Sequence, residues 1–213
     1  MNTQIRDTLI KICKEKIKTD DPSHDILHTM RVLANAEYIA GKENGDLDVV
    51  IPGALFHDLV CYDKNDPRNQ YSVSESADMA SKILEGVKEY PKEKITRVAS
   101  AILSTSFTYG KETENMEDEI VQASDMLEAV GAISIMRTFS YSGKLNRLFY
   151  NADDPFGNNR ELDDMKYSID LFYTRLLNIK DRIKTKTAKS IAERRTKFLL
   201  DFLEEFKKEL NGE

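Results

Sequence analysis

Apolar residues recur at intervals of three and four along most of this chain, which is the spacing of one face of an α-helix. The 213 residues include only 9 glycines and 5 prolines, so few positions interrupt long helices. A β-sandwich with many turns would need such residues far more often. The sequence therefore predicts an all-α protein.

The predicted helices are separated by short polar segments. Their expected ranges are 3–18, 24–40, 47–59, 74–88, 91–104, 120–139, 167–181 and 187–210. Residues 61–73, 110–119 and 140–165 are expected to be loops or irregular structure, because turn-forming or acidic residues concentrate there. No internal repeat or linker divides the chain, so we expect one domain over residues 1–213, with core motifs in about 20–135 and a helical extension over about 140–210.

The charge pattern and the cysteines limit which classes of protein this chain can belong to. The N-terminal segment carries Arg6, Asp7 and several lysines where a signal peptide needs an apolar core, and no apolar run approaches the roughly 18 residues of a membrane span. We therefore expect a cytoplasmic protein without a membrane partner. Cys13 and Cys61 lack the spacing of a disulfide framework or a structural zinc site. A net charge of −6 argues against binding a nucleic-acid polymer but not against a nucleotide substrate, because a bound cation can reverse the local potential.

The chain has 3 histidines, and their spacing singles them out. His24 and His28 are four residues apart on one predicted helix, so they share a face. His57 is followed directly by Asp58 at the end of the apolar stretch 49–56. A single histidine on a helix is more often an ordinary core or surface residue than a metal ligand. A carboxylate against an apolar core is harder to explain, because burying it is costly unless it is paired, hydrogen-bonded or ligated.

Each acidic candidate also has an ordinary explanation. Asp58 could form an ion pair with Arg31 or Lys64 instead of binding a metal. Asp125 lies among small and apolar neighbours, which indicates tight packing, but it could equally be a surface aspartate. The basic segment 180–197 could attract a polyphosphate, although a solvated helix face opposite Ile183, Ile191 and Phe198 is the favoured interpretation.

Several blocks of the sequence, taken in order, resemble the HD-domain superfamily of metal-dependent phosphohydrolases. These are residues 24–32 (HDILHTMRV), 56–64 (FHDLVCYDK) and 124–132 (SDMLEAVGA). A bacterial single-domain branch of the family also shows stretches like 154–156 (DPF), 160–164 (RELDD) and 172–177 (FYTRLL). The resemblance covers roughly residues 20–205, and several ordered blocks are far more specific than a lone His-Asp pair.

The resemblance implies a fold and a metal site. The fold would be an HD-domain helical bundle, and His28, His57, Asp58 and Asp125 would bind one divalent ion. Two imidazoles and two carboxylates suit Mn²⁺, Fe²⁺, Ni²⁺ or Zn²⁺, with Co²⁺ and Mg²⁺ as further options. Only His24 is then spare, which favours a mononuclear site. Such an ion is expected to polarise a phosphoryl group and to lower the pKa of its bound water.

Other residues are candidates for the remaining chemistry. Asp58 and Asp63 are the candidate catalytic residues; Asp63 would act as general base or orient the attacking water, and its alternative is a solvated loop residue. His24, Arg31 and Lys64 are candidates for substrate binding through phosphate contacts.

The expected function is an enzyme that hydrolyses a phosphoester or phosphoanhydride of a small phosphorylated metabolite, with a nucleotide as the favoured substrate. The branch commonly has other residues where Met126, Glu128 and Leu171 stand. These departures support an alternative, a catalytically weak metal-bearing module that binds a nucleotide or a partner protein as a regulator. A third alternative is a structural helical domain with incidental histidines. A homo-oligomer is compatible with the sequence.

Overall fold

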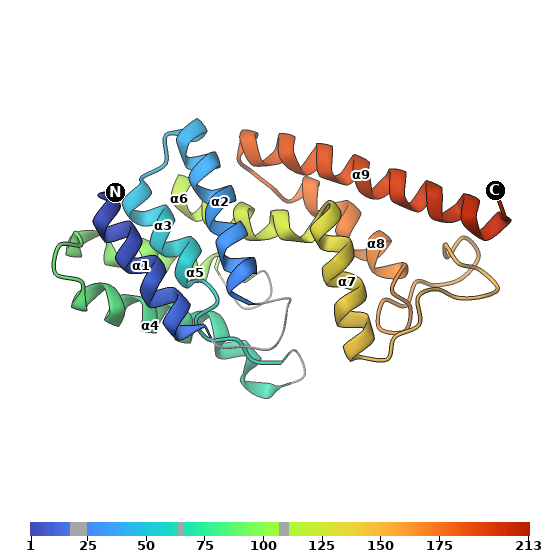
Figure 1. Cartoon of the computed structure of the whole chain (residues 1–213), viewed down its shortest axis with the longest axis horizontal. Coiled ribbons are helices and arrows are strands. Elements are labelled where there is room, and N and C mark those ends of the chain that lie inside the picture. The colour runs from blue at the N-terminus through green and yellow to red at the C-terminus, as the bar shows by residue number, and fades with distance from the viewer. Residues whose placement is uncertain (18–24, 64–65, 107–110) are drawn as a thin grey trace. The chain divides into compact units, whose positions relative to one another are not determined.

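The computed structural model describes residues 1–17, 25–63, 66–106 and 111–213. Within these residues, helices are joined by loops, and the only β-type pairing is an isolated bridge between Leu148 and Tyr167 (Figure 1). The all-α prediction is confirmed. The described chain divides into two compact units, Met1–Asp125 and Met126–Glu213. The expectation of one domain over residues 1–213 stays a prediction.

The first unit is built around a short helix that is buried on every side. This helix, α3, contacts α1, α2, α4 and α5 (Figure 1), and each of its residues from Val49 to Phe56 is buried. A helix that is apolar all round belongs in a core, which is where α3 lies. The helices of this unit are α1 (Thr3–Lys16), α2 (Ile26–Glu43), α3 (Leu47–Phe56), α4 (Ser72–Gly86), α5 (Ile95–Leu103) and α6 (Met116–Met126).

Pro52 lies inside α3, beyond its first turn. A proline lacks the N–H that would bond to the carbonyl four residues earlier, so the carbonyl of Asp48 needs another donor. The hydroxyl of Tyr90 donates to that carbonyl at 2.7 Å. Burial raises the pKa of Tyr90, so the hydroxyl keeps its proton and remains a donor.

Gly53 allows α3 and α6 to approach closely. A Cβ atom at position 53 would lie only 2.9 Å from Cγ2 of Val121, which is closer than real Cβ contacts. Because α3 ends at Phe56 and α6 ends at Met126, this close approach brings together the ends of two helices. Those ends carry the predicted metal ligands.

The predicted helix over residues 120–139 is wrong in its middle. The chain forms α6, which begins at Met116 inside an expected loop, then a 3-10 turn over Leu127–Ala129, and then α7 over Ala132–Lys144. Gly131 separates the turn from α7 with φ 85° and ψ −161°, a conformation that L side chains rarely adopt. The apolar spacing continues across this break, so periodicity alone did not reveal it.

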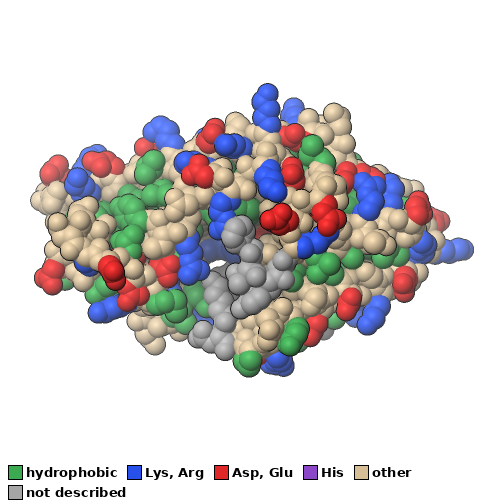
Figure 2. Space-filling view, turned by 180° about the vertical axis from the view of Figure 1, so that it is seen from behind, with side chains coloured by type: hydrophobic (Ala, Val, Ile, Leu, Met, Phe, Trp, Pro, Cys, Tyr) green, Lys and Arg blue, Asp and Glu red, His purple; other side chains and the backbone are tan. Residues whose placement is uncertain are grey.

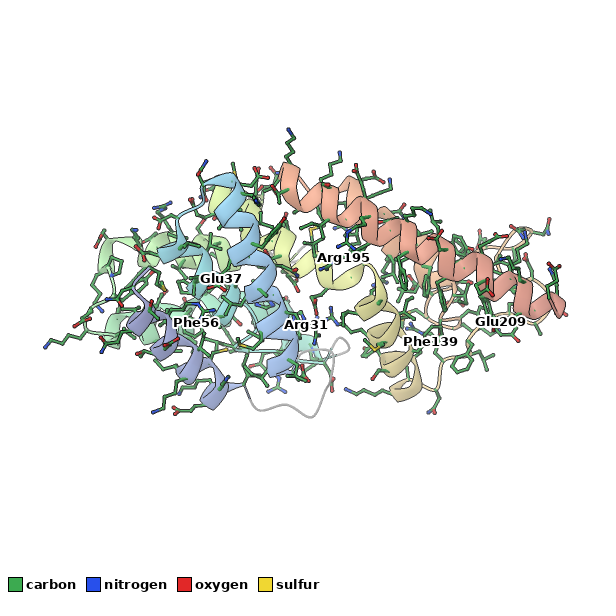
Figure 3. The ribbon with its side chains drawn as sticks, turned by 45° about the horizontal axis from the view of Figure 1, so that its top comes forward. Arg31, Glu37, Phe56, Phe139, Arg195 and Glu209 are labelled. Atoms are coloured by element: carbon green, nitrogen blue, oxygen red, sulfur yellow. The ribbon has the colours of Figure 1, made fainter. Side chains whose placement is uncertain are left out.

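The second unit has a long C-terminal helix, α9 (Lys186–Asn211). The helix predicted over 167–181 is also wrong, because α8 spans only Asp170–Thr174 and a 3-10 turn over Leu176–Asp181 follows it. The ring centroid of Phe139 on α7 (labelled in Figure 3) is 6.5 Å from that of Phe202 on α9. Rings around this pair form one aromatic cluster, made of Phe139, Phe149, Tyr150, Phe156, Phe172, Phe202 and Phe206.

The irregular segment between α7 and α8 is ordered by hydrogen bonds. Arg160 donates to both carboxylate oxygens of buried Asp170, at 2.6 and 2.7 Å. Its Nε also donates to the carbonyl of Asp154, whose carboxylate accepts backbone N–H bonds from Asn158 and Asn159. These backbone bonds hold the pKa of Asp154 below its ordinary value. A loop without regular structure can thus be rigid.

The basic segment 180–197 forms only in part the solvated helix face that the sequence favoured. Its buried stripe on α9 is formed by Ala188, Ala192, Thr196, Leu199 and Leu203. Phe198, expected to be buried, is instead exposed. Arg195 turns inward and donates to the carbonyl of Leu127 at 2.7 Å (Figure 3), and burial lowers its pKa, with the charge of Glu128 opposing that shift.

The surface shown in Figure 2 mixes acidic and basic side chains, with hydrophobic groups between them. Among the described helices, none combines the length and the hydrophobicity that a membrane crossing requires. Neither Cys13 nor Cys61, both within the described residues, is in a disulfide; Cys13 is buried and Cys61 is exposed.

Candidate metal centre

His28 is placed by the start of α2. Asp25 is the N-cap of this helix, and its carboxylate accepts the backbone N–H of His28 at 2.8 Å. An aspartate at this position satisfies one of the backbone donors that a helix start leaves without an internal partner. The cap fixes the first turn, so the buried side chain of His28 leaves the helix in a defined direction.

His57 is placed by the end of α3. A helix end leaves its last carbonyl groups without internal donors. Here Nδ1 of His57 lies 2.8 Å from the carbonyl of Ala54. The thiol of Cys13 donates to the carbonyl of Leu55, and the N–H of Leu59 donates to the carbonyl of Phe56 at 3.4 Å. A carbonyl can only accept, so Nδ1 carries a proton, and in the neutral ring the lone pair is then on Nε2. This hydrogen bond orients the ring so that Nε2 is the nitrogen that could bind a metal.

His57 and Asp58 follow the helix instead of lying within it. The prediction extended α3 to Leu59, but the helix ends at Phe56 and His57 is its C-cap. Because the helix has ended, adjacent side chains in this turn need not diverge as they do on a regular helix. Nε2 of His57 and Oδ2 of Asp58 are 3.4 Å apart.

Asp125 is placed by the last turn of α6. The side-chain amide of Asn35, on α2, donates to the carbonyl of Ser124 at 3.3 Å. The hydroxyl of Ser124 bonds back to the carbonyl of Ile120 at 2.6 Å. The backbone that carries Asp125 is therefore tied both to its own helix and to α2.

The four predicted ligands meet in the first unit. Oδ1 of Asp125 is 3.4 Å from Nε2 of His28 and 3.7 Å from Nε2 of His57. Oδ2 of Asp58 is 3.6 Å from Nε2 of His28 and, as noted, 3.4 Å from that of His57. The two imidazole rings meet edge to face, with centroids 5.4 Å apart.

These separations suit ligands around an ion. Adjacent ligand atoms lie about 3.0 Å apart around an octahedral ion and about 3.4 Å apart around a tetrahedral one, when each is about 2.1 Å from the metal. Single ligand atoms of His28, His57 and Asp125 all lie within 4.8 Å of one another. Nε2 of His57 is buried and has no hydrogen-bond partner among the described residues. A lone pair buried beside two carboxylates is well explained by a cation, so the residues fit the group that the sequence predicted.

The electrostatics of the cluster favour a charged Asp125. Burial by itself would raise the pKa of this carboxyl group, and the charge of Asp58 acts in the same direction. The pKa nevertheless lies below its ordinary value, because the His28 and His57 side chains stabilise the carboxylate more strongly. The side chains of Asp58 and Asp125 are 24% and 31% exposed, so the cluster can be reached from solvent while both histidines are buried.

The remaining predicted site residues have different positions. Arg31 lies on α2, one turn after His28 (Figure 3), and Asp63 is exposed in the loop after the His57-Asp58 turn. His24 and Lys64 lie outside the described residues. Asp25 and Asn35 were missed by the sequence interpretation. An aspartate just before a helical pattern is a recognisable cap signal, whereas nothing in the sequence marks Asn35.

Comparisons with known proteins find relatives that match nearly the whole chain. A family model described as the HD domain matches residues 26–130. The uncharacterized protein YpgQ of Bacillus subtilis is 34% identical over 208 residues, which cover 95% of this chain and 93% of YpgQ. The crystal structure of YpgQ in complex with ADP has a TM-score of 0.73 at 30% identity, covering 97% of this chain and 98% of that one. The crystal structure of an HD-superfamily hydrolase from Bacillus thuringiensis has a TM-score of 0.73 at 30% identity, covering 99% and 98%.

Proposed function

Because this chain belongs to the HD-domain superfamily of hydrolases, we propose that it is a metal-dependent phosphohydrolase with one divalent ion bound by His28, His57, Asp58 and Asp125. The observation that carries the proposal is the convergence of two imidazole nitrogens and two carboxylate oxygens at 3.4–3.7 Å. Mn²⁺, Fe²⁺, Co²⁺, Ni²⁺ and Zn²⁺ suit this mixed donor set, and Mg²⁺ suits its carboxylates.

A divalent ion in this site would polarise a phosphoryl oxygen and make a water molecule more acidic. The chain's own residues would do the rest. Asp58 would be both a ligand and the group that orients the attacking water. Asp63, exposed in the following loop, would take up the proton that this water releases. Arg31 would bind a phosphate oxygen, as would His24 and Lys64, which lie outside the described residues.

We propose a nucleotide as the substrate. YpgQ, which the chain matches over nearly its whole length, was crystallised in complex with ADP. A phosphoester or phosphoanhydride of a nucleotide would bring its phosphate to the exposed side of Asp58 and Asp125. The reaction is hydrolysis of that bond by water.

The test combines metal analysis with a substrate panel. The full-length protein is purified, its bound metal is quantified, and nucleotides are assayed with Mn²⁺, Co²⁺, Ni²⁺ or Mg²⁺. We expect one ion per chain and turnover of at least one nucleotide. Asp58→Ala should lose at least about a thousandfold in turnover, because removing about 4 kcal/mol of transition-state stabilisation gives that factor.

Asp78→Ala is the matched control, because Asp78 is an exposed carboxylate on α4. It should bind metal and turn over substrate like the unmodified protein. Tight nucleotide binding without turnover of any substrate would favour the regulatory module. Absence of stoichiometric metal, with no effect of His57→Ala on metal content, would refute the metal site.

A further inference from the structure

Ser76 on α4 makes an unusual pair of hydrogen bonds. Its side-chain hydroxyl accepts the backbone N–H of Val60 at 3.0 Å and donates to the carbonyl of the same residue at 3.2 Å. The side chain is fully buried, and its partner is 16 residues away in sequence. One hydroxyl therefore satisfies both backbone polar groups of a residue outside any helix.

A serine within a helix ordinarily bonds to its own helix. Ser81, also on α4, shows this ordinary pattern, because its hydroxyl donates to the carbonyl of Ala77 at 2.9 Å. Ser72, one turn before Ser76, instead accepts the N–H of Tyr62 at 3.4 Å. The face of α4 that carries Ser72 and Ser76 thus holds alternate residues of the segment after Asp58.

The bonds from Ser76 join the segment after Asp58 to a second helix. Within the His57-Asp58 turn itself, the N–H of Leu59 donates to the carbonyl of Phe56 at 3.4 Å. The Ser76 bonds fix Val60, two residues after Asp58, to a helix that does not carry a ligand. A metal site requires its ligand atoms to be held within a few tenths of an ångström.

We propose that Ser76 is a positioning residue for the metal centre, acting through the backbone of Val60 to hold Asp58 beside His28 and His57. This inference rests on the proposed function, because it assumes that Asp58 is a ligand. Ser76 need not contact the ion or the substrate. Its role is to keep Asp58 in the place where a cation can bind without first ordering the turn.

The test measures metal affinity directly in the full-length protein. Mn²⁺ is titrated into the metal-free protein by calorimetry, for the unmodified chain, Ser76→Ala and Ser81→Ala. We expect Ser76→Ala to bind Mn²⁺ about tenfold more weakly, the lower end of the range for residues that support metal ligands. Ser81→Ala removes a hydroxyl from the same helix without touching the turn and should stay within about twofold of the unmodified chain.

Two further readouts separate positioning from general stability. Turnover of Ser76→Ala should recover towards the unmodified value at saturating Mn²⁺, because the change weakens metal binding and leaves the chemistry intact. Ser76→Cys keeps the size of the side chain but hydrogen-bonds poorly, so it tests the same idea if the alanine variant does not fold. A folded Ser76→Cys protein should also bind Mn²⁺ more weakly.

The outcomes distinguish this proposal from the one it rests on. If Ser76→Ala and Ser76→Cys bind Mn²⁺ as tightly as the unmodified chain, the positioning role is wrong and the metal site stands. If the unmodified chain does not bind Mn²⁺ or another divalent ion, the proposed function fails and this inference fails with it.

Discussion

Buried polar groups have different uses in the two compact units. In Met1–Asp125, the imidazoles of His28 and His57 meet two carboxylates, and the surrounding hydrogen bonds hold the helix ends that carry them. In Met126–Glu213, the Arg160–Asp170 pair orders an irregular segment, and phenylalanine rings supply the packing. The cluster in the first unit gathers nitrogen and oxygen atoms that could bind a cation. The ion pair in the second unit instead neutralises its two charges against each other.

Substitutions of buried polar groups should therefore affect metal binding in the first unit and mainly the free energy of unfolding in the second. Removing one of the proposed ligands from the first unit should abolish metal binding, because each of them would supply an atom that binds the ion. Removing one member of the ion pair in the second unit should mainly destabilise the fold, since it leaves the other charge buried without a counterion.

The largest expected effect on stability is that of Arg160→Ala. Asp170 is fully buried, so the variant should lose about 3 kcal/mol of unfolding free energy, measured by urea denaturation. Its affinity for Mn²⁺ should equal that of the unmodified protein. The control is Arg175→Ala, because Arg175 is 55% exposed and pairs with Asp164; it should lose no more than about 0.5 kcal/mol. A large loss of metal affinity in Arg160→Ala would show that the two units do not have separate roles.

A smaller loss of unfolding free energy is expected when the Glu117 carboxylate of the first unit is removed. Burial would raise the pKa of Glu117, but bonds from the backbone of Asp46 and from Arg97 hold that pKa below its ordinary value. A lowered pKa adds stability that is complete above the unfolded-state pKa, near 4.3, and is lost as the pH falls through the folded-state value. Glu117→Gln should therefore lose about 1 kcal/mol at pH 7, allowing for the exposure of Arg97.

The same variant should show a weaker fall in stability between pH 5 and pH 3. Glu114→Gln is the matched control, because the Glu114 carboxylate is 70% exposed. Its pH dependence should follow that of the unmodified protein. Equal curves for all three proteins would contradict a lowered pKa at Glu117.

The smallest expected effect concerns the two thiols. Cys13 is buried against the carbonyl of Leu55, and burial raises its pKa to about 12, so it should be inert to a thiol reagent at neutral pH. Exposed Cys61 should react. In Arg160→Ala the labelling of Cys13 should remain slow while the second unit is destabilised. Faster labelling of Cys13 in that variant, with Cys61 unchanged, would mean that the loss spreads into the first unit.

The fold class and most helices could be predicted from the sequence, because apolar spacing records which face of a helix is buried. The predictions failed where one residue outweighs the pattern. Gly131, the N-cap of α7, interrupts the predicted helix through its backbone conformation, and the apolar spacing passes over it. The helix expected over 167–181 failed for a similar reason, since a 3-10 turn preserves a comparable apolar spacing.

The candidate site was partly visible in the sequence. The types and spacing of His28, His57 and Asp58 made them candidates, as did the small and apolar neighbours of Asp125. The family resemblance then implied that the four bind one ion. Their convergence depends on the close approach of α3 and α6 at Gly53, which no local pattern encodes. Ser76 could not be found at all, because serine is common in helices and its partner becomes evident only in three dimensions.

The boundary between the units falls directly after Asp125, in the last turn of α6. A gene fragment truncated at that boundary would leave this carboxylate on a fraying helix terminus, next to a new negatively charged chain end. Dissecting the protein into separately expressed halves should therefore disturb a carboxylate that the proposed metal site uses.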